Sequence, residues 1–133
     1  MGPLYHLMDK EERRKALCEA YRVLRPGGLL IATGISKFSS ATWALSVYRT
    51  ANNFIDDEVY MNMLRGELIK GEHHGPEKYP NFIAEAYFHT PGAFAAELSE
   101  SGFKIVHNKS RTAYTRSCPA FYYLTATAIK YGL

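Results

Sequence analysis

An adjacent phenol and imidazole, Tyr5 and His6, are the side chains of this sequence best suited to chemistry. An imidazole titrates near neutral pH and can orient or deprotonate a nucleophile, while an aromatic ring beside it can shape a pocket. Both lie in the opening segment, Gly2 to Leu7. A purely structural interpretation is also open, in which Tyr5 packs against a helix at Leu17 and His6 caps a turn.

A second polar group, Glu72-His73-His74 with Glu77, lies in the middle of the chain. Imidazole and carboxylate groups are ligands of zinc and other divalent metals. Adjacent histidines on an extended segment point in different directions, and no second cluster has the spacing of ligands on a helix. The sequence therefore predicts a solvated loop without a metal site, and a stand-alone metal-binding protein is only a third hypothesis for its function.

The elements that must position these residues begin with a helix. Asp9 and Glu12 form a capping box that starts it, and Pro26 with the following glycines ends it. Its apolar stripe, at helical spacing, comprises Leu17, Ala20, Tyr21 and Leu24. On the other face, three cationic side chains are expected in solvent: Arg13, Arg14 and Lys15.

The apolar run Leu29–Ile35 predicts a central parallel strand with helices on both faces, because both alternating sets of positions are apolar. Open α/β sheets bind ligands at the carboxyl ends of their strands. Ser36 and Lys37 follow directly, so we expect a substrate near them.

The rest of the chain is predicted to form further helices and strands, some of which cover a substrate pocket. Two helices are predicted between 39 and 70, a short extended segment over 84–88, a third helix over 91–101, and strands over 103–106 and 121–129. Most of the aromatic residues in the middle of the chain are expected in a core. Three are expected to line a lid that excludes water from a substrate: Phe38, Trp43 and Tyr60.

Two motifs carry a family resemblance. Gly2-Pro3-Leu4-Tyr5-His6-Leu7 and Val23-Leu24-Arg25-Pro26-Gly27-Gly28 resemble a loop after the fourth strand and a turn before the fifth in the class I S-adenosylmethionine (SAM)-dependent methyltransferases of the small-molecule type. The resemblance implies an α/β fold: the C-terminal half of a Rossmann-like domain, with flanking helices. Its three-stranded partial sheet would hold strands five, six and seven, the seventh antiparallel between the others. Residues 1–133 would be a single partial domain, with 36–89 as a substrate-side lid insertion.

Methyl transfer from SAM to a small molecule is the activity that this resemblance implies. It assigns His6 as a catalytic base and places Gly2, Pro3, Leu4 and Tyr5 near the cofactor. The implied substrate contacts are Tyr5, His6, Ser36, Lys37, Phe38, Trp43 and Tyr60. The glycine-rich cofactor turn of the family has no counterpart here, since no G-x-G-x-x-G occurs, so this chain alone is expected to bind SAM poorly or not at all.

The charge distribution and the hydropathy of the sequence limit the kinds of partner that this protein is expected to bind. The 16 basic and 13 acidic residues are scattered, without the dense basic run that follows a phosphate backbone, so nucleic acid is not expected as a partner. No apolar stretch approaches the roughly 20 residues of a membrane span, so we expect no membrane partner and a cytoplasmic protein. A free edge on strand 29–35 predicts self-association or pairing with a missing segment. The alternative function is accordingly a non-catalytic, truncated module that associates through this edge.

Overall fold

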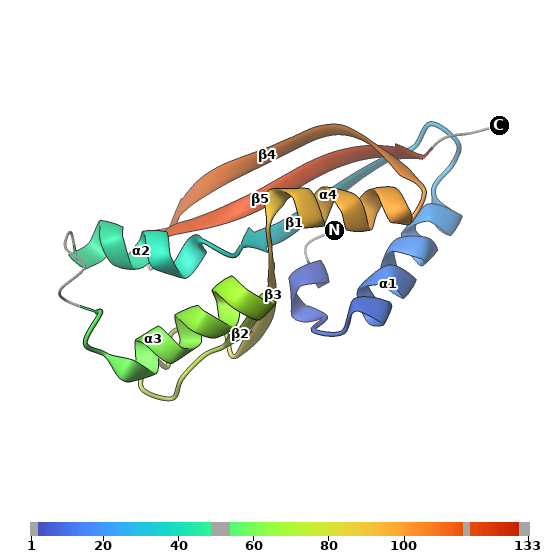
Figure 1. Ribbon diagram of the computed structural model, residues 1–133. Coiled ribbons are helices and arrows are strands. Elements are labelled where there is room, and N and C mark those ends of the chain that lie inside the picture. The colour runs from blue at the N-terminus through green and yellow to red at the C-terminus, as the bar shows by residue number, and fades with distance from the viewer. Residues whose placement is uncertain (1–2, 49–53, 116–117, 131–133) are drawn as a thin grey trace.

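The computed structural model describes residues 3–48, 54–115 and 118–130 (Figure 1). Gly2, expected near the cofactor, lies outside the described residues. The elements in chain order are η1 (Pro3–His6), α1 (Lys10–Val23), β1 (Leu29–Ser36), α2 (Ser39–Tyr48), α3 (Glu58–Arg65), the π-helical turn η3 (Gly66–Lys70), β2 (Glu72–His74), β3 (Glu85–His89), α4 (Pro91–Glu100), β4 (Phe103–Thr115) and β5 (Cys118–Lys130).

The sheet has five strands in the order β2-β3-β1-β5-β4, so the predicted count of three is wrong. β5 lies antiparallel between β1 and β4, which is the arrangement predicted for the last strand. The two additional strands are short. β3 pairs parallel with β1 at Ile35 and Ser36, and β2 pairs antiparallel with β3. β3 falls where a short extended segment is expected, over 84–88, but its pairing with β1 and with β2 leaves no mark in the side-chain pattern, so neither was counted in the sheet.

β4 and β5 are longer than predicted. The predicted strand 103–106 extends to Thr115, and 121–129 begins at Cys118. Residues 107–112 are mostly polar, so no apolar alternation marks them as a strand. These residues form a strand because their backbone groups bond to β5 in an antiparallel ladder, which does not depend on the side-chain type.

Local signals set the helix ends where the sequence predicts them. Asp9 caps α1 by accepting the N–H of Glu12 at 3.0 Å. Thr90 caps α4 in the same way, and its side chain accepts the N–H of Ala93 at 3.1 Å. After α1 the chain turns through Gly27 at a φ of 76°, a left-handed conformation that glycine adopts without a steric penalty.

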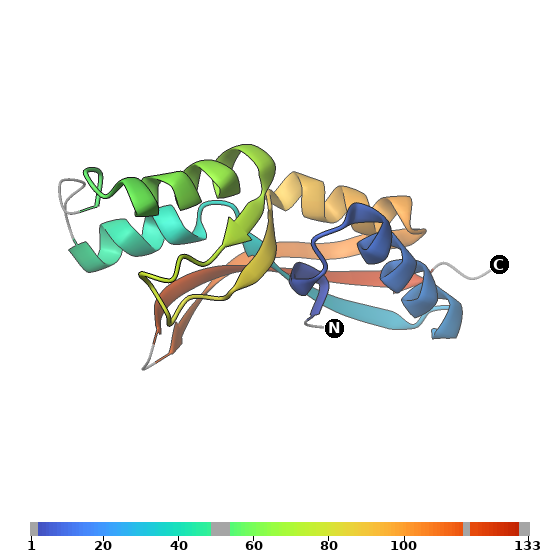
Figure 2. The ribbon, with the colours of Figure 1, turned by 90° about the horizontal axis from the view of Figure 1, so that it is seen from below.

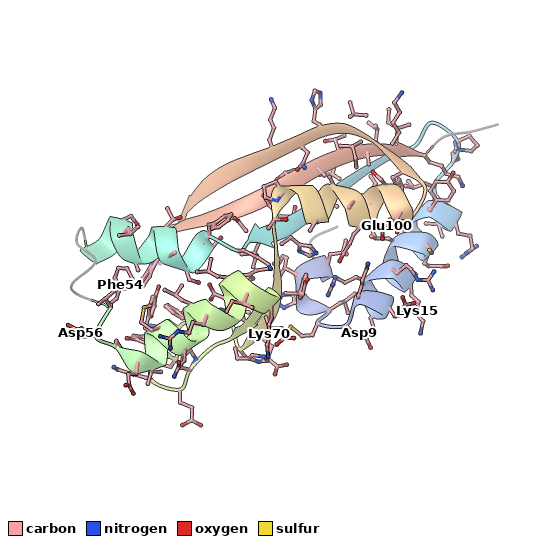
Figure 3. All side chains as sticks on the ribbon, viewed as in Figure 1. Asp9, Lys15, Phe54, Asp56, Lys70 and Glu100 are labelled. Atoms are coloured by element: carbon pink, nitrogen blue, oxygen red, sulfur yellow. The ribbon has the colours of Figure 1, made fainter. Side chains whose placement is uncertain are left out.

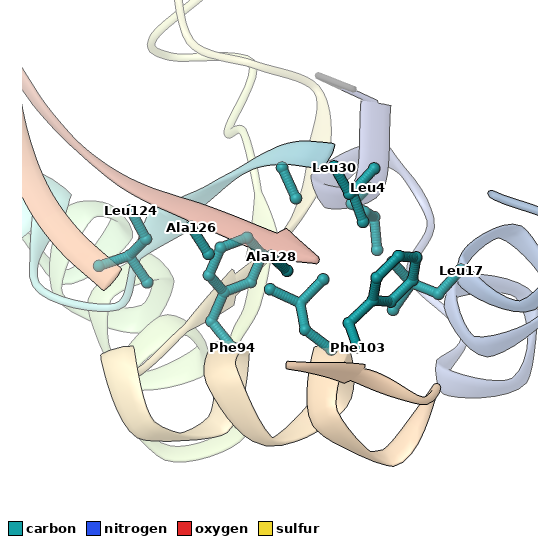
Figure 4. Packing of buried hydrophobic residues seen from close by; sticks show 10 residues of the cluster. Leu4, Leu17, Leu30, Phe94, Phe103, Leu124, Ala126 and Ala128 are labelled. Carbon is teal, nitrogen blue, oxygen red and sulfur yellow. The ribbon is translucent and has the colours of Figure 1, made fainter. Parts of the chain in front are cut away.

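The main core lies between one face of the sheet and the helices α1 and α4 (Figure 4). It is formed by Leu4, Leu17, Leu30, Ala32, Phe94, Leu98, Phe103, Leu124, Ala126 and Ala128. The predicted stripe of α1 faces this core, since Leu17 belongs to it and Ala20, Tyr21 and Leu24 pack against it. Burial of these apolar surfaces is the main source of stability for this part of the fold.

The opposite face of β1 is uncovered at Leu29 and Ile31, although Ile35 of the same face is buried beside Tyr5, so the expectation of helices on both faces is wrong for the described residues. The helices α1, α2 and α4 lie on one side of β1, β5 and β4 (Figures 1 and 2). Other side chains project from the sheet on the side away from these helices (Figure 3). Leu29 and Ile31 keep 59% and 57% of their surface exposed, whereas the alternate residues Leu30 and Ala32 are buried.

A second apolar cluster joins α2 to α3. It contains Ala44, Phe54, Tyr60, Met63 and Leu64, with Ala41, Trp43, Met61, Tyr79 and Phe82 packed against it. No helix in the described ranges is long and apolar enough to cross a membrane.

Candidate functional site

The opening segment and the carboxyl end of β1 meet at one place. η1 contacts both β1 and β3, and Tyr5 packs against a buried cluster that contains Ile35 and Phe88. Lys37, just beyond β1, donates its backbone N–H to the carbonyl oxygen of His89 at 2.9 Å. Two parts of the predicted site, far apart in the sequence, therefore lie side by side.

Tyr5 and His6 form an adjoining pair of rings, with centroids 4.4 Å apart. Tyr5 is half-buried and His6 is exposed. Leu4, not Tyr5, enters the core beside Leu17, so the structural interpretation that packed Tyr5 there is wrong. The backbone of Pro3 begins η1. An exposed imidazole beside a partly buried phenol can meet a ligand without any rearrangement of the core.

The residues after β1 turn the chain toward η3. Ser36 is buried, and its hydroxyl oxygen accepts the N–H of Phe38 at 3.3 Å. Lys37 Nζ donates to the carbonyl oxygen of Ile69 at 3.3 Å. Phe38 is 53% exposed. Phe38 is thus the most accessible of these three predicted substrate contacts, while the Ser36 side chain helps to shape the turn.

Trp43 and Tyr60 lie in the second apolar cluster. Their rings stack with centroids 6.4 Å apart, and Tyr60 is only 1% exposed. The Tyr60 hydroxyl donates to the carbonyl oxygen of Ser40 at 2.8 Å. Tyr60 is therefore part of the packing between α2 and α3, and Trp43 is half-buried beside it.

A buried polar cluster beneath α2 escaped the sequence analysis. Glu67 Oε1 accepts from the Ser40 hydroxyl at 2.8 Å and lies 2.6 Å from His73 Nδ1. His73 Nε2 lies 2.9 Å from the carbonyl oxygen of Ile83. Because that carbonyl can only accept, Nε2 carries a hydrogen, and the short contact to Glu67 needs a further proton between the two groups. The cluster ties α2, η3 and β2 together.

These contacts also describe the loop considered for metal binding. His73 is engaged with Glu67 and Ile83, while His74 is exposed and its Nδ1 lies 3.5 Å from Glu85 Oε1. Within the part of the chain that the structure describes, no group of three or more potential ligand side chains gathers as a metal site requires.

Arg13, expected in solvent, is instead 1% exposed and paired with Glu97 of α4. Glu97 Oε2 also lies 3.3 Å from His89 Nε2. Burial opposes the ionisation of Glu97, but His89 and Arg13 outweigh it and lower the pKa of this carboxyl to about 2. No sequence signal marks this pair, since the two residues are 84 positions apart.

The fold of the whole chain was compared with the folds of solved structures. A crystal structure of a SAM-dependent methyltransferase from Methanosarcina mazei matches 98% of this chain with a TM-score of 0.66 and 21% sequence identity. This chain has the fold of that methyltransferase. The match spans 57% of the other protein's length, little more than half of it. No family model matches the sequence, and a search of curated proteins finds no match.

The residues present fit only part of a SAM site. A glycine-rich turn that holds such a cofactor follows a strand and opens a helix. Among the described residues, the glycines with positive φ are Gly27, Gly71 and Gly102, and each follows a helix instead. The described residues therefore contain no glycine-rich turn of the kind that would hold the amino-acid portion of SAM.

Proposed function

We propose that this chain supplies the substrate-side part of a SAM-dependent methyltransferase that acts on a small molecule. The observation that carries the proposal is the match of 98% of the chain to a methyltransferase fold. The meeting of the Tyr5 loop with the carboxyl end of β1 supports it, because open α/β sheets bind their ligands at that end.

Each residue then has a definite task. When bound, SAM would supply an electrophilic methyl group to an oxygen, nitrogen, carbon or sulfur atom of the acceptor and would leave as S-adenosylhomocysteine. Tyr5 and Phe38 border the acceptor, and the exposed His6 takes up the proton that the acceptor loses. Most of the rate enhancement comes from positioning, since an in-line displacement depends on the alignment of its reactants. The cytoplasm is the proposed location.

The uncovered face of the sheet is where the rest of such a domain packs in this proposal. Leu29 and Ile31 expose most of their apolar surface there, and Ile35 of the same face leads to Tyr5. The matched methyltransferase has further chain beyond the 57% that corresponds to this one. A glycine-rich turn from such a segment would complete the cofactor site next to η1.

Titration with S-adenosylhomocysteine, followed by ¹H–¹⁵N NMR, tests the proposal on the chain itself. We expect weak binding, with a dissociation constant on the order of 1 mM, and shift changes concentrated at Leu4–Leu7 and Ser36–Phe38. Tyr5→Ala should weaken these changes, whereas Tyr79→Ala in the second cluster should not. Shift changes located elsewhere, or none at the highest soluble ligand concentration, would contradict the proposal.

A second candidate function is a non-catalytic module that associates with itself along β1. The exposed Leu29 and Ile31 favour it. Part of the predicted free edge is covered, because β3 pairs with Ile35 and Ser36. Sedimentation velocity distinguishes the two functions: a stable dimer that does not bind S-adenosylhomocysteine supports the module, and a monomer over a wide range of concentration counts against it.

A further inference from the structure

We propose that Arg13 is a positioning residue, which holds the Tyr5-His6 loop against the rest of the candidate site. The inference deepens the proposed function and rests on it for its meaning, but its geometry stands independently. Arg13 lies on α1, and its side chain is 2% exposed. A guanidinium that is buried so completely needs partners for its N–H groups, and these partners show what it holds.

One branch of the guanidinium holds the loop. Nη1 donates to two successive carbonyl oxygens, those of Leu7 and Met8, at 2.8 Å each. These residues follow His6 directly, so two bonds from one rigid group fix the path by which the chain leaves η1. The N–H of Leu7 also bonds to the carbonyl oxygen of Leu4 at 3.2 Å, which closes the turn that carries Tyr5 and His6.

The other branch holds the opposite wall. Nε and Nη2 donate to the Glu97 carboxylate at 3.0–3.2 Å, and Cζ lies 3.7 Å from the centre of the Tyr87 ring. Glu97 contacts the His89 ring, and the His89 carbonyl accepts the N–H of Lys37. A continuous set of contacts therefore runs from the loop, through Arg13, to the residue that follows β1.

The planar, forked shape of arginine explains why this residue type stands here. A guanidinium donates in fixed directions on two sides, whereas the ammonium group of lysine is a compact charge on a flexible stem. Lysine can keep the attraction to Glu97, but it cannot reach both loop carbonyls and the carboxylate together. Arg13→Lys therefore keeps the positive charge but removes the bonds that position the loop. Arg14→Met is the control, because Arg14 is exposed and pairs with Glu11 on the same helix.

Amide hydrogen exchange and NMR shifts of the full chain test the inference without any cofactor. In Arg13→Lys we expect exchange of the Leu7 amide to accelerate by at least about tenfold, while amides in the middle of β5 keep their protection. The ring-current shift that Tyr5 imposes on His6 should shrink. Arg14→Met should change neither. The loop resonances should also lose their response to S-adenosylhomocysteine, while those of Ser36–Phe38 keep theirs.

Glu97→Gln supplies the decisive comparison. It removes the carboxylate charge but leaves the Nη1 bonds to the loop, so the Leu7 amide should stay protected. Equal acceleration in Glu97→Gln and Arg13→Lys would show that Arg13 acts through the helix pair and would overturn the inference. So would an unchanged Leu7 amide and His6 shift in a folded Arg13→Lys protein. If the unmodified chain does not respond to S-adenosylhomocysteine, the proposed function fails while the exchange result still decides the role of Arg13.

Discussion

The carboxylate of Glu97 should make the stability of this protein depend on acid pH in a defined window. Its pKa is lowered from an ordinary 4.5 to about 2 in the folded state, where Arg13 and His89 favour the charged form. A carboxyl with a depressed folded pKa contributes stability above its unfolded pKa. That contribution is lost as the pH falls from about 4.5 toward 2.

The magnitude follows from the two pKa values. The difference between 4.5 and about 2 corresponds to about 3 kcal/mol at neutral pH. The side chain is 13% exposed, and screening by solvent lowers this value to about 2 kcal/mol. By linkage, less than about half of the contribution remains at pH 3.

Urea unfolding of the native chain and of Glu97→Gln at several pH values between 7 and 3 measures the effect. Glutamine leaves the buried Arg13 without a carboxylate at every pH, which adds a destabilisation that does not vary with pH. The remaining difference between the two proteins should shrink by more than about 1 kcal/mol between pH 7 and pH 3. The reasoning is refuted if the two stability curves stay parallel across this window.

Three further predictions concern the cores and the uncovered face. Leu17→Ala should lower the free energy of unfolding by about 3 kcal/mol in urea titrations, because Leu17 is 1% exposed within the main core. Glu67→Gln should cost about 3 kcal/mol, since it breaks a buried pair with His73, whereas Glu85→Gln at the exposed pair should change the melting temperature little; equal effects would contradict this account. Leu29→Lys should leave the unfolding free energy within about 0.5 kcal/mol and reduce any association seen by sedimentation, while Ile69→Lys, at a 75% exposed site on η3, should not alter association.

Much of the first third of the fold, and α4, follow from the sequence because their signals are local. The Asp9 and Thr90 caps act within three residues, and Pro26 with Gly27 stops α1 whatever surrounds it. The apolar run of β1 is likewise visible in the sequence. The proposed ligand site at the carboxyl end of β1 also follows from the sequence, because the direction of the chain defines which end of a strand is the carboxyl end.

The tertiary structure alone decided how polar groups are shared between distant segments. Arg13 is buried because Glu97, 84 positions further along the chain, neutralises it, and no periodicity in the sequence reveals such a partner. Glu67 and His73 are close in the sequence, but they are buried as a pair because the Ser40 hydroxyl and the Ile83 carbonyl oxygen, from other segments, bond with them.

Tertiary packing also decides which apolar residues of β1 are buried. A strand with apolar residues in both alternating sets of positions predicts cover on both faces, and the described residues place helices on only one of them. The alternation of side chains along β1 is local and could be predicted. Which of the two faces is covered depends on the segments that pack against the strand. In this structure α1 and α4 pack against one face, because their apolar side chains are removed from water there.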